Sequence, residues 1–122
     1  MYRTFIETNF SAAHQLHGYQ GHCGKLHGHT WKIRVEVETN TIDDIGIGID
    51  FKELKKITHT VISELDHEHI NMIPPFDKQN PTAENLAKFI YHGIGKKLPQ
   101  QVTMVQITVW ESEHYAVSYV EP

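Results

Sequence analysis

The chain has 122 residues, of which 39% are hydrophobic, and a formal net charge of −4. That length suits one ordinary domain, so we expect residues 1–122 to fold as a single domain. The sequence has no run of basic residues and no apolar run near the ~20 residues of a membrane-spanning helix, which argues against nucleic acids and membranes as partners. Cys23 is the only cysteine, so an internal disulfide is excluded and a cytoplasmic location is expected.

Two strands are predicted at the start of the chain. Residues 2–13 are rich in aromatic and β-branched side chains, as is typical of a strand. Residues 30–38 alternate apolar and charged side chains, which predicts a second strand with one buried face. The stretch between them is rich in glycine, so its backbone is free to turn and to aim side chains at a common point.

Two helices are predicted in the middle of the chain. The first begins near Phe51, where Asp50 and Glu53 resemble a capping box, and ends near Leu65. The second opens at residues 80–82, where Asn-Pro-Thr is typical of a helix start. Apolar residues recur at spacings of three and four along both segments, so each helix has one apolar face.

Two more strands are predicted over residues 102–111 and 115–120. In the first of these, an apolar face that includes Val105, Ile107 and Val109 is expected to continue to the end of the strand. The order β-β-α-α-β-β then gives a four-stranded antiparallel sheet with two helices on one face, in the α+β class. Such a sheet has exposed edges, so we expect the chain to oligomerise through them.

Histidine is the unusual residue of this chain. Ten are present, and five of them lie within sixteen residues. If the second strand extends backwards, His27 and His29 point to the same face, and two neighbouring imidazoles with a third ligand form a catalytic type of zinc site. His14 is the nearest candidate for the third ligand, but the spacing leaves His17 and His22 open. A pair of exposed loop histidines is the alternative to a metal site.

Cys23 lies four residues before His27. A thiol beside a zinc ion or an imidazolium shifts toward thiolate, which makes it a base or nucleophile at neutral pH. Two alternatives stay open, a fourth zinc ligand in a closed structural site and a small inert buried residue.

Asp66, His67 and Glu111 are further candidates for chemistry. Asp66 beside His67 suits a general acid whose tautomer and charge are held by a carboxylate, although a polar helix end explains the pair equally simply. Glu111 follows the apolar face of its strand, where a carboxylate could accept two N–H groups from a flat ligand edge. The alternative for Glu111 is an ordinary carboxylate on the rim.

Several segments together resemble the 6-pyruvoyl-tetrahydropterin synthase family, and most of all its bacterial branch of 6-carboxy-5,6,7,8-tetrahydropterin synthases. The segments are residues 10–14, 23–29, 49–51, 65–67, 80–87 and 109–111. Cys-x3-His-x-His is the most specific of these motifs, because the pyruvoyl-forming branch typically has five residues between the cysteine and the first histidine. The chain departs from the family at Met72, where relatives often have aspartate, so the local loop structure there is in doubt.

The resemblance implies a zinc ion held by His14, His27 and His29. It implies that Cys23 is the catalytic base, in contact with the substrate bound at the ion.

The resemblance also implies that His67 and Asp66 form a proton relay. It implies that Glu111 binds the guanidine-like edge of a pterin and takes part in the relay. Thr82 is a further candidate for substrate binding, and Lys25 is a candidate for part of the cationic pocket that a triphosphate requires.

The implied reaction converts 7,8-dihydroneopterin triphosphate to 6-carboxytetrahydropterin, acetaldehyde and triphosphate, in queuosine precursor synthesis. The implied architecture is the tunnelling fold, in which subunits join their sheets into a barrel, commonly a hexamer of two stacked trimers. Two alternatives stay open. One is a 6-pyruvoyl-tetrahydropterin synthase, which eliminates triphosphate but keeps the three-carbon side chain, and the other is a non-catalytic zinc-binding module.

Overall fold

A computed structural model describes residues 1–21 and 24–122. The elements follow in the order β1 (Tyr2–His14), β2 (His27–Thr39), α1 (Phe51–Ile62), α2 (Ala83–Gly95), β3 (Val102–Trp110) and β4 (Ala116–Tyr119). A 3-10 helix, η2 (Ile70–Met72), lies between the two α-helices. The predicted order β-β-α-α-β-β and the α+β class are confirmed.

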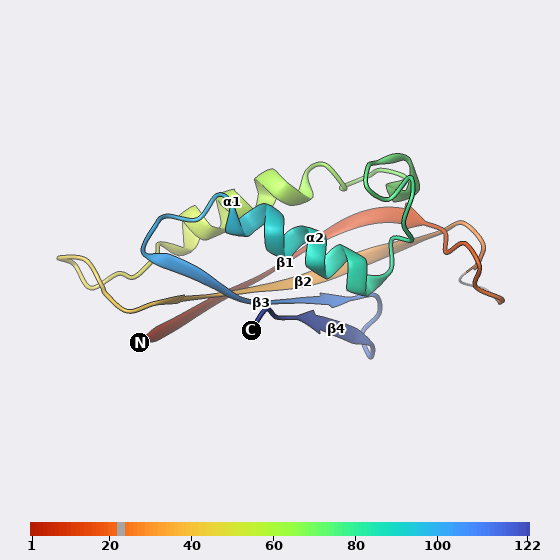
Figure 1. The fold of residues 1–122 in the computed structure, drawn as a ribbon. Helices are drawn as coiled ribbons and strands as arrows, with labels where there is room; N and C mark the ends of the chain where they lie inside the picture. Colours follow the sequence, from red (N-terminus) through yellow and green to blue (C-terminus); the bar gives the residue numbers. More distant parts are fainter. Residues whose placement is uncertain (22–23) are drawn as a thin grey trace.

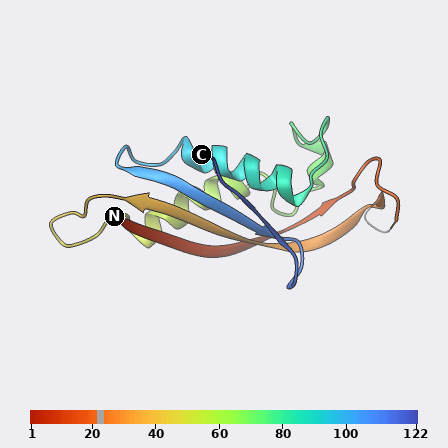
Figure 2. The ribbon, with the colours of Figure 1, turned by 60° about the horizontal axis from the view of Figure 1, so that its bottom comes forward.

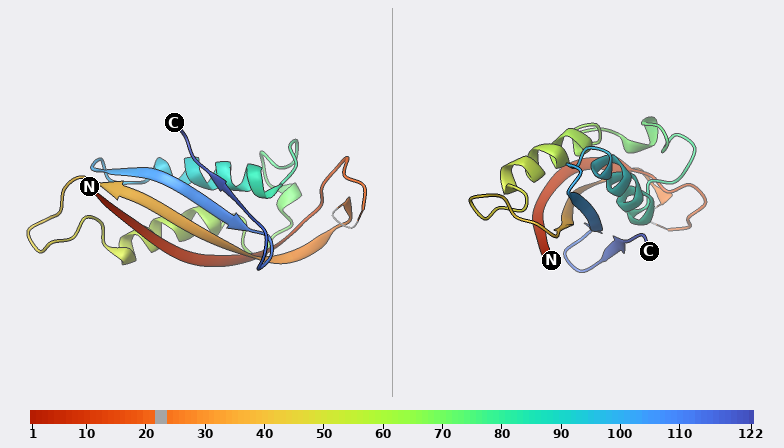
Figure 3. Two further views of the ribbon diagram at one scale, coloured as in Figure 1. Left: turned by 90° about the horizontal axis from the view of Figure 1, so that it is seen from below. Right: turned by 60° about the vertical axis from the view of Figure 1, so that its left-hand side comes forward.

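The four strands form one antiparallel sheet in the order β1-β2-β3-β4. Both helices cover the same face of this sheet (Figure 1). The opposite face carries no helix in the part of the chain that the structure describes, as the views from below show (Figures 2 and 3). None of the described helices is long and apolar enough to span a bilayer.

The hairpin of β1 and β2 is the longest feature of the sheet. The two strands pair along their whole length, from Tyr2 opposite Thr39 to His14 opposite His27. Strand β2 therefore begins at His27, three residues before the strand predicted from alternation. This extension is what puts His27 and His29 on the same side of the sheet as the buried Trp31.

Strand β3 contains a β-bulge. Opposite β2, the register passes from Gln106 to Met104, so Val105 is the extra residue. The predicted alternation is wrong at Val105, which is half-buried, whereas Ile107 and Val109 are fully buried. The bulge shifts by one residue which side chains face the core. Ile107 and Val109 therefore lie on the core face as predicted, and Val105 does not.

The first helix begins and ends for local reasons. The Asp50 side chain accepts a hydrogen bond from the Lys52 N–H at 2.8 Å, which confirms the predicted cap. The helix ends at Ile62, a few residues before the predicted end at Leu65. Leu65 is nevertheless fully buried, so the apolar spacing identified its environment correctly although the last turn is not helical.

The core fills the space between the inner face of the sheet and the two helices. Its largest fully buried side chains are Trp31, Phe10, Phe76, Ile33, Leu54, Ile62, Leu65, Ile70, Leu86, Ile90, Ile94 and Ile107. Burial of this apolar surface is the main term that favours the fold. Phe10 and Trp31 place the core directly beside the histidine-bearing end of the hairpin.

Candidate metal centre and active site

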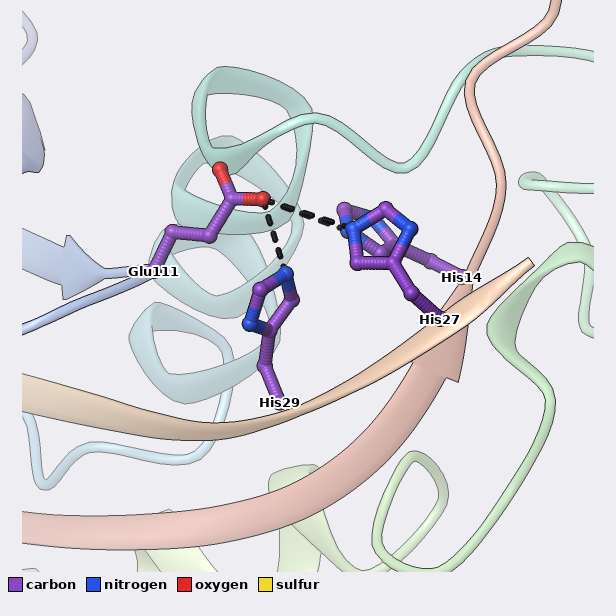
Figure 4. A group of neighbouring side chains, drawn as sticks. All are labelled: His14, His27, His29 and Glu111. Carbon is purple, nitrogen blue, oxygen red and sulfur yellow. Dashed lines mark hydrogen bonds and ion pairs between the residues drawn. The ribbon is translucent and has the colours of Figure 1, made fainter. Parts of the chain in front are cut away.

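Three histidines and one glutamate converge at one end of the sheet. His14 ends β1, His27 and His29 begin β2, and Glu111 directly follows β3 (Figure 4). The register sets His14 opposite His27, and the alternation of side chains turns all three imidazoles toward the core side. The sequence left the third ligand open between three histidines. The structure brings His14 into the group.

The ligand atoms of these four residues all lie within 4.8 Å of one another. The Nε2 atoms of His14 and His27 are 3.0 Å apart. Oε1 of Glu111 lies 3.0 Å from Nε2 of His29, 3.4 Å from Nε2 of His14 and 3.8 Å from Nε2 of His27. A cation placed among these atoms would meet three imidazole nitrogens and a carboxylate oxygen, which are ligands that zinc accepts.

The remaining ring nitrogens decide the tautomers of two of the histidines. Nδ1 of His14 lies 2.8 Å from the Pro81 carbonyl oxygen, and Nδ1 of His27 lies 2.6 Å from the Lys25 carbonyl oxygen. Because a carbonyl oxygen only accepts, each neutral ring carries its proton on Nδ1. The Nε2 lone pairs of His14 and His27 then face each other at 3.0 Å, an arrangement that a cation between them would stabilise.

Burial favours the neutral form of two histidines of the cluster. His14 is completely inaccessible to solvent, and this burial is the main cause that lowers its pKa. Burial is also the main cause that lowers the pKa of His29. Nε2 of His29 is buried, and Oε1 of Glu111 lies 3.0 Å from it. Two imidazoles whose neutral form is favoured by burial, together with a carboxylate oxygen, fit a metal ion at this position.

An aromatic floor supports the imidazoles. The Trp31 ring lies edge-on to His14 and His29, with ring centroids 4.8 and 5.3 Å apart. Phe10 stacks on the same indole at 6.3 Å. Since Trp31 is fully buried, the rings that face the cluster rest on a part of the core that cannot move without repacking.

Asp66 and His67 lie outside the metal cluster, along the outer edge of β1. Oδ1 of Asp66 accepts the Ser11 N–H at 3.0 Å and lies 3.0 Å from Nδ1 of His67. The Ser11 N–H is the main cause that holds the pKa of Asp66 below its usual value. His67 has a positive φ of 60° and a side chain that is 82% exposed, so its ring is presented to solvent with Nδ1 held by the carboxylate.

A hollow of about 580 Å³ reaches both His67 and His29. Its wall is made of Ser11, Ala12, Ala13, Gly28, His29, Thr30, His67, Glu68 and His69. The lining therefore includes one residue of the cluster, His29, and His67 at the edge of β1.

The roles predicted for Cys23, Lys25 and Thr82 are not tested by the contacts of the described residues. Cys23 lies outside the described residues, so its role stays a prediction. The Lys25 carbonyl oxygen accepts a hydrogen bond from Nδ1 of His27. The Thr82 hydroxyl oxygen caps α2 by accepting the Asn85 N–H at 3.1 Å. Neither contact speaks for or against the substrate-binding roles predicted for the Lys25 ammonium group and the Thr82 hydroxyl.

His17, the other described candidate for the third ligand, stays exposed and outside the cluster. Its backbone is held by the Asn80 side chain through two hydrogen bonds of 2.8 Å. His22 lies outside the described residues. The choice between His14 and His17 depended on the strand register, which the spacing alone does not specify.

The loop around Met72 is well connected. Met72 itself is 74% exposed, and its neighbour Asn71 binds both backbone groups of Gln15 at 2.8 and 2.9 Å. The departure from the family pattern at this position therefore lies on the surface of η2.

Sequence reasoning missed two features of the site. It treated Glu111 as a ligand-edge acceptor and did not place it among the histidines, although the parity of β3 puts it on the core side. It also missed the carbonyl oxygen of Pro81, for which no sequence signal exists because any residue supplies a carbonyl.

Comparisons with known proteins agree with this geometry. The family model for 6-pyruvoyl tetrahydropterin synthase matches residues 4–122. The dihydroneopterin monophosphate aldolase of Pyrococcus furiosus is 36% identical over 115 residues, with 94% of each chain covered. The 6-carboxy-5,6,7,8-tetrahydropterin synthase of Haemophilus influenzae is 30% identical, with 99% of this chain and 100% of the relative covered.

The fold is shared with solved structures. The structure of 6-pyruvoyl tetrahydropterin synthase from Caenorhabditis elegans matches with a TM-score of 0.85 at 23% identity, over 99% of this chain and 96% of that chain. The sequence motifs, the sheet with two helices on one face, and a family match over nearly the whole chain lead to one conclusion. The chain belongs to the 6-pyruvoyl tetrahydropterin synthase family.

Proposed function

We propose that the chain is a zinc-dependent 6-carboxy-5,6,7,8-tetrahydropterin synthase, a carbon–carbon lyase. It would convert 7,8-dihydroneopterin triphosphate and water to 6-carboxytetrahydropterin, acetaldehyde and triphosphate, as a step of queuosine precursor synthesis. The observation that carries the proposal is the convergence of three imidazole nitrogens and one carboxylate within 4.8 Å. The full-length similarity to the Haemophilus influenzae enzyme of that name supports the choice of reaction.

The zinc ion would be held by His14, His27 and His29. When bound, it supplies Lewis acidity to the hydroxyl groups of the substrate side chain. The protein prepares the site before any ion binds, because two rings are fixed as Nδ1–H tautomers by carbonyl oxygens and His14 is buried against the core.

Proton transfer is assigned to Cys23, His67 and Asp66. Cys23 would remove a proton from the substrate side chain, and His67 would return one at a neighbouring carbon. Asp66 would hold the His67 proton on Nδ1, since its Oδ1 lies 3.0 Å from that atom, and so would leave Nε2 of His67 toward the substrate. The hollow shared by His67 and His29 is the space in which that side chain would lie.

Glu111 is assigned to the pterin ring. One of its carboxylate oxygens faces the histidines and the other points away from them (Figure 4). The oxygen that points away could accept a hydrogen bond from the guanidine-like edge of the pterin. Lys25 is proposed for the triphosphate and Thr82 for a further substrate contact.

A second candidate function is the aldol cleavage of dihydroneopterin monophosphate. It is favoured by the 36% identity to the Pyrococcus furiosus aldolase over 94% of both chains. Both reactions need a base and a polarised side-chain hydroxyl, so the same cluster could serve either. They differ in the phosphate group of the substrate and in the aldehyde that is released.

In this proposal, the chain acts as a single domain of residues 1–122. It assembles through its sheet edges into a barrel, as a hexamer of two trimers. A cytoplasmic location belongs to the proposal, because the chain has one cysteine and cannot form an internal disulfide.

Product analysis tests the proposed function. The zinc-loaded protein is incubated separately with dihydroneopterin triphosphate and with the monophosphate, the aldehyde is trapped, and the pterin is identified by mass spectrometry. We expect acetaldehyde, triphosphate and 6-carboxytetrahydropterin from the triphosphate. A Cys23→Ala variant should keep its zinc and lose turnover by roughly 10²–10⁴-fold, as expected for a positioned acid–base group.

Other products would support the alternatives. A pterin that keeps a pyruvoyl side chain, with no aldehyde trapped, would indicate a 6-pyruvoyl-tetrahydropterin synthase. Preferred turnover of the monophosphate with release of a phosphorylated aldehyde would indicate the aldolase. No turnover of either compound by the zinc-loaded protein would favour a non-catalytic zinc-binding module.

A further inference from the structure

The segment 80–82, which precedes α2 and which we call the α2 anchor, contacts the metal centre from behind. The Pro81 carbonyl oxygen accepts a hydrogen bond from Nδ1 of His14 at 2.8 Å. Both partners are buried, so water does not compete for this bond. The orientation of a ring in the cluster thus depends on a backbone group 67 residues away in the sequence.

Asn80 binds the chain on the other side of His14. Its Oδ1 accepts the His17 N–H at 2.8 Å, and its Nδ2 donates to the His17 carbonyl oxygen at 2.8 Å. The amide therefore pairs with the backbone as a neighbouring strand would. It fixes the loop that follows His14 to the same segment that receives the His14 ring.

The α2 anchor is itself held firmly. The Asn80 carbonyl oxygen accepts a hydrogen bond from Nδ2 of Asn85 at 2.8 Å, and the Thr82 hydroxyl oxygen accepts the Asn85 N–H at 3.1 Å. The ring of Pro81 locks its own φ and restricts the residue before it. These contacts hold the Pro81 carbonyl oxygen in position independently of the His14 ring.

We propose that Asn80 is a positioning residue of the metal centre, which holds the Pro81 carbonyl oxygen against the His14 ring. In that role it keeps His14 as the Nδ1–H tautomer and aims its Nε2 at His27 and Glu111. The proposal goes beyond the function proposed above. It concerns the preparation of the ligand cluster and does not depend on which pterin reaction follows.

A general loosening of the loop after β1 is the competing explanation for any effect of Asn80, and the chain offers a matched control. Asn71 makes the same reciprocal amide pair with the backbone of Gln15, at 2.8 and 2.9 Å. It does so from η2 and has no part in the α2 anchor. Substituting either asparagine removes an equivalent pair from the same stretch of chain, but only one substitution acts through Pro81.

The test compares Asn80→Asp with Asn71→Asp in the full chain. Aspartate keeps the shape but presents a second acceptor to a backbone carbonyl oxygen, so each variant loses one donor at equal charge. Zinc affinity is measured by competition with a chelator. We expect Asn80→Asp to weaken zinc binding by about 10–100-fold, the range for residues that orient metal ligands, and Asn71→Asp to change it less than about 3-fold.

A second measurement is independent of zinc and of turnover. Long-range ¹H–¹⁵N spectra of the metal-free protein report the tautomer of each histidine, with the His14 signal assigned from its absence in His14→Gln. We expect the Nδ1–H tautomer of His14 in the wild type and in Asn71→Asp, and a mixture of tautomers in Asn80→Asp. Should either aspartate variant fail to fold, the alanine pair at the same positions replaces it.

Two results would overturn the proposal. One is an Asn80 variant with wild-type zinc affinity and an unchanged His14 tautomer. The other is an Asn71 variant with an equal effect on both, because the α2 anchor would then have no special role. A wild-type protein that binds no zinc or turns over no pterin would contradict the proposed function, and the His14 tautomer would still decide the role of Asn80.

Discussion

At the residue scale, the groups around each histidine decide its properties. His14 is buried between the Pro81 carbonyl oxygen and the Trp31 ring, and its pKa is lowered by burial. His67 stands on the surface with a carboxylate beside Nδ1. The same imidazole is therefore buried where the proposed zinc site needs a neutral ligand, and exposed beside a carboxylate where the proposed relay needs a proton carrier.

Removing ligand groups one at a time tests the composition of the cluster. His29→Ala should abolish zinc binding, because it deletes one of three nitrogens. Glu111→Gln should weaken zinc binding by about 10-fold, since it removes a negative charge 3.0–3.8 Å from the three Nε2 atoms. The measurement is zinc affinity, and Glu113→Gln, at an exposed carboxylate two residues further on, is the control.

Two outcomes would contradict this expectation. Full zinc occupancy in His29→Ala would remove that residue from the ligand set. Wild-type zinc affinity in Glu111→Gln, together with weaker binding of a non-reactive pterin, would restrict the carboxylate to the pterin.

Asp66 predicts a dependence of stability on pH. Its pKa is lowered in the folded protein, chiefly by the Ser11 N–H, so its stabilising effect is fully present above the unfolded value of about 3.9 and is lost as the pH falls through the lower folded value. Urea unfolding of the wild type and of Asp66→Asn should show a constant difference from pH 7 to about 4.5 and a shrinking one below about pH 4. A difference that stays constant down to pH 2.5 would show that the carboxylate charge has no part in this hydrogen bond.

At the element scale, the ends of strands and helices build the site. Strand β2 begins at His27, and α2 begins beside a segment that receives the His14 ring. Side chains at such ends are held by regular hydrogen bonding on one side and are free to face a ligand on the other. The cap of α2 therefore supports both the helix and the metal centre.

Thr82 allows the capping role to be separated from substrate binding. Thr82→Ala removes the acceptor of the Asn85 N–H and should lower the free energy of unfolding by about 1 kcal/mol, whereas Thr82→Ser should keep it. Urea unfolding measures this difference. The KM for the pterin triphosphate, measured at saturating zinc because the cap also supports the His14 ring, then tests the predicted substrate contact: an unchanged KM in Thr82→Ala would contradict it.

At the scale of the whole molecule, the sheet has two open edges. One edge of β1 pairs with β2. Among the described residues, its other edge makes backbone hydrogen bonds with the same chain only near its C-terminal end, to the segment 67–69. Strand β4 is the other edge. Exposed edges of this length are normally covered by another chain.

We therefore expect assembly in solution. Sedimentation equilibrium should give a mass several times that of one chain, with six copies as the expected number. A charge introduced at the exposed Ala116 of β4, by Ala116→Glu, has a matched counterpart in Thr41→Glu on the exposed loop 40–47, and only the first should shift the equilibrium toward smaller species. A fully active monomer would contradict the barrel assembly.

The sequence by itself determined the order of the elements, their buried faces and the pairing of His27 with His29. These features are local, because alternation, capping residues and apolar spacing act over a few neighbouring residues. The register of β1 on β2 chose His14 over His17, and the end of β3 brought Glu111 to the histidines. The hydrogen bond between His14 and the Pro81 carbonyl oxygen joins residues 67 positions apart. Only the tertiary structure decided these contacts, because they depend on how distant segments pack and not on the residues next to them in the chain.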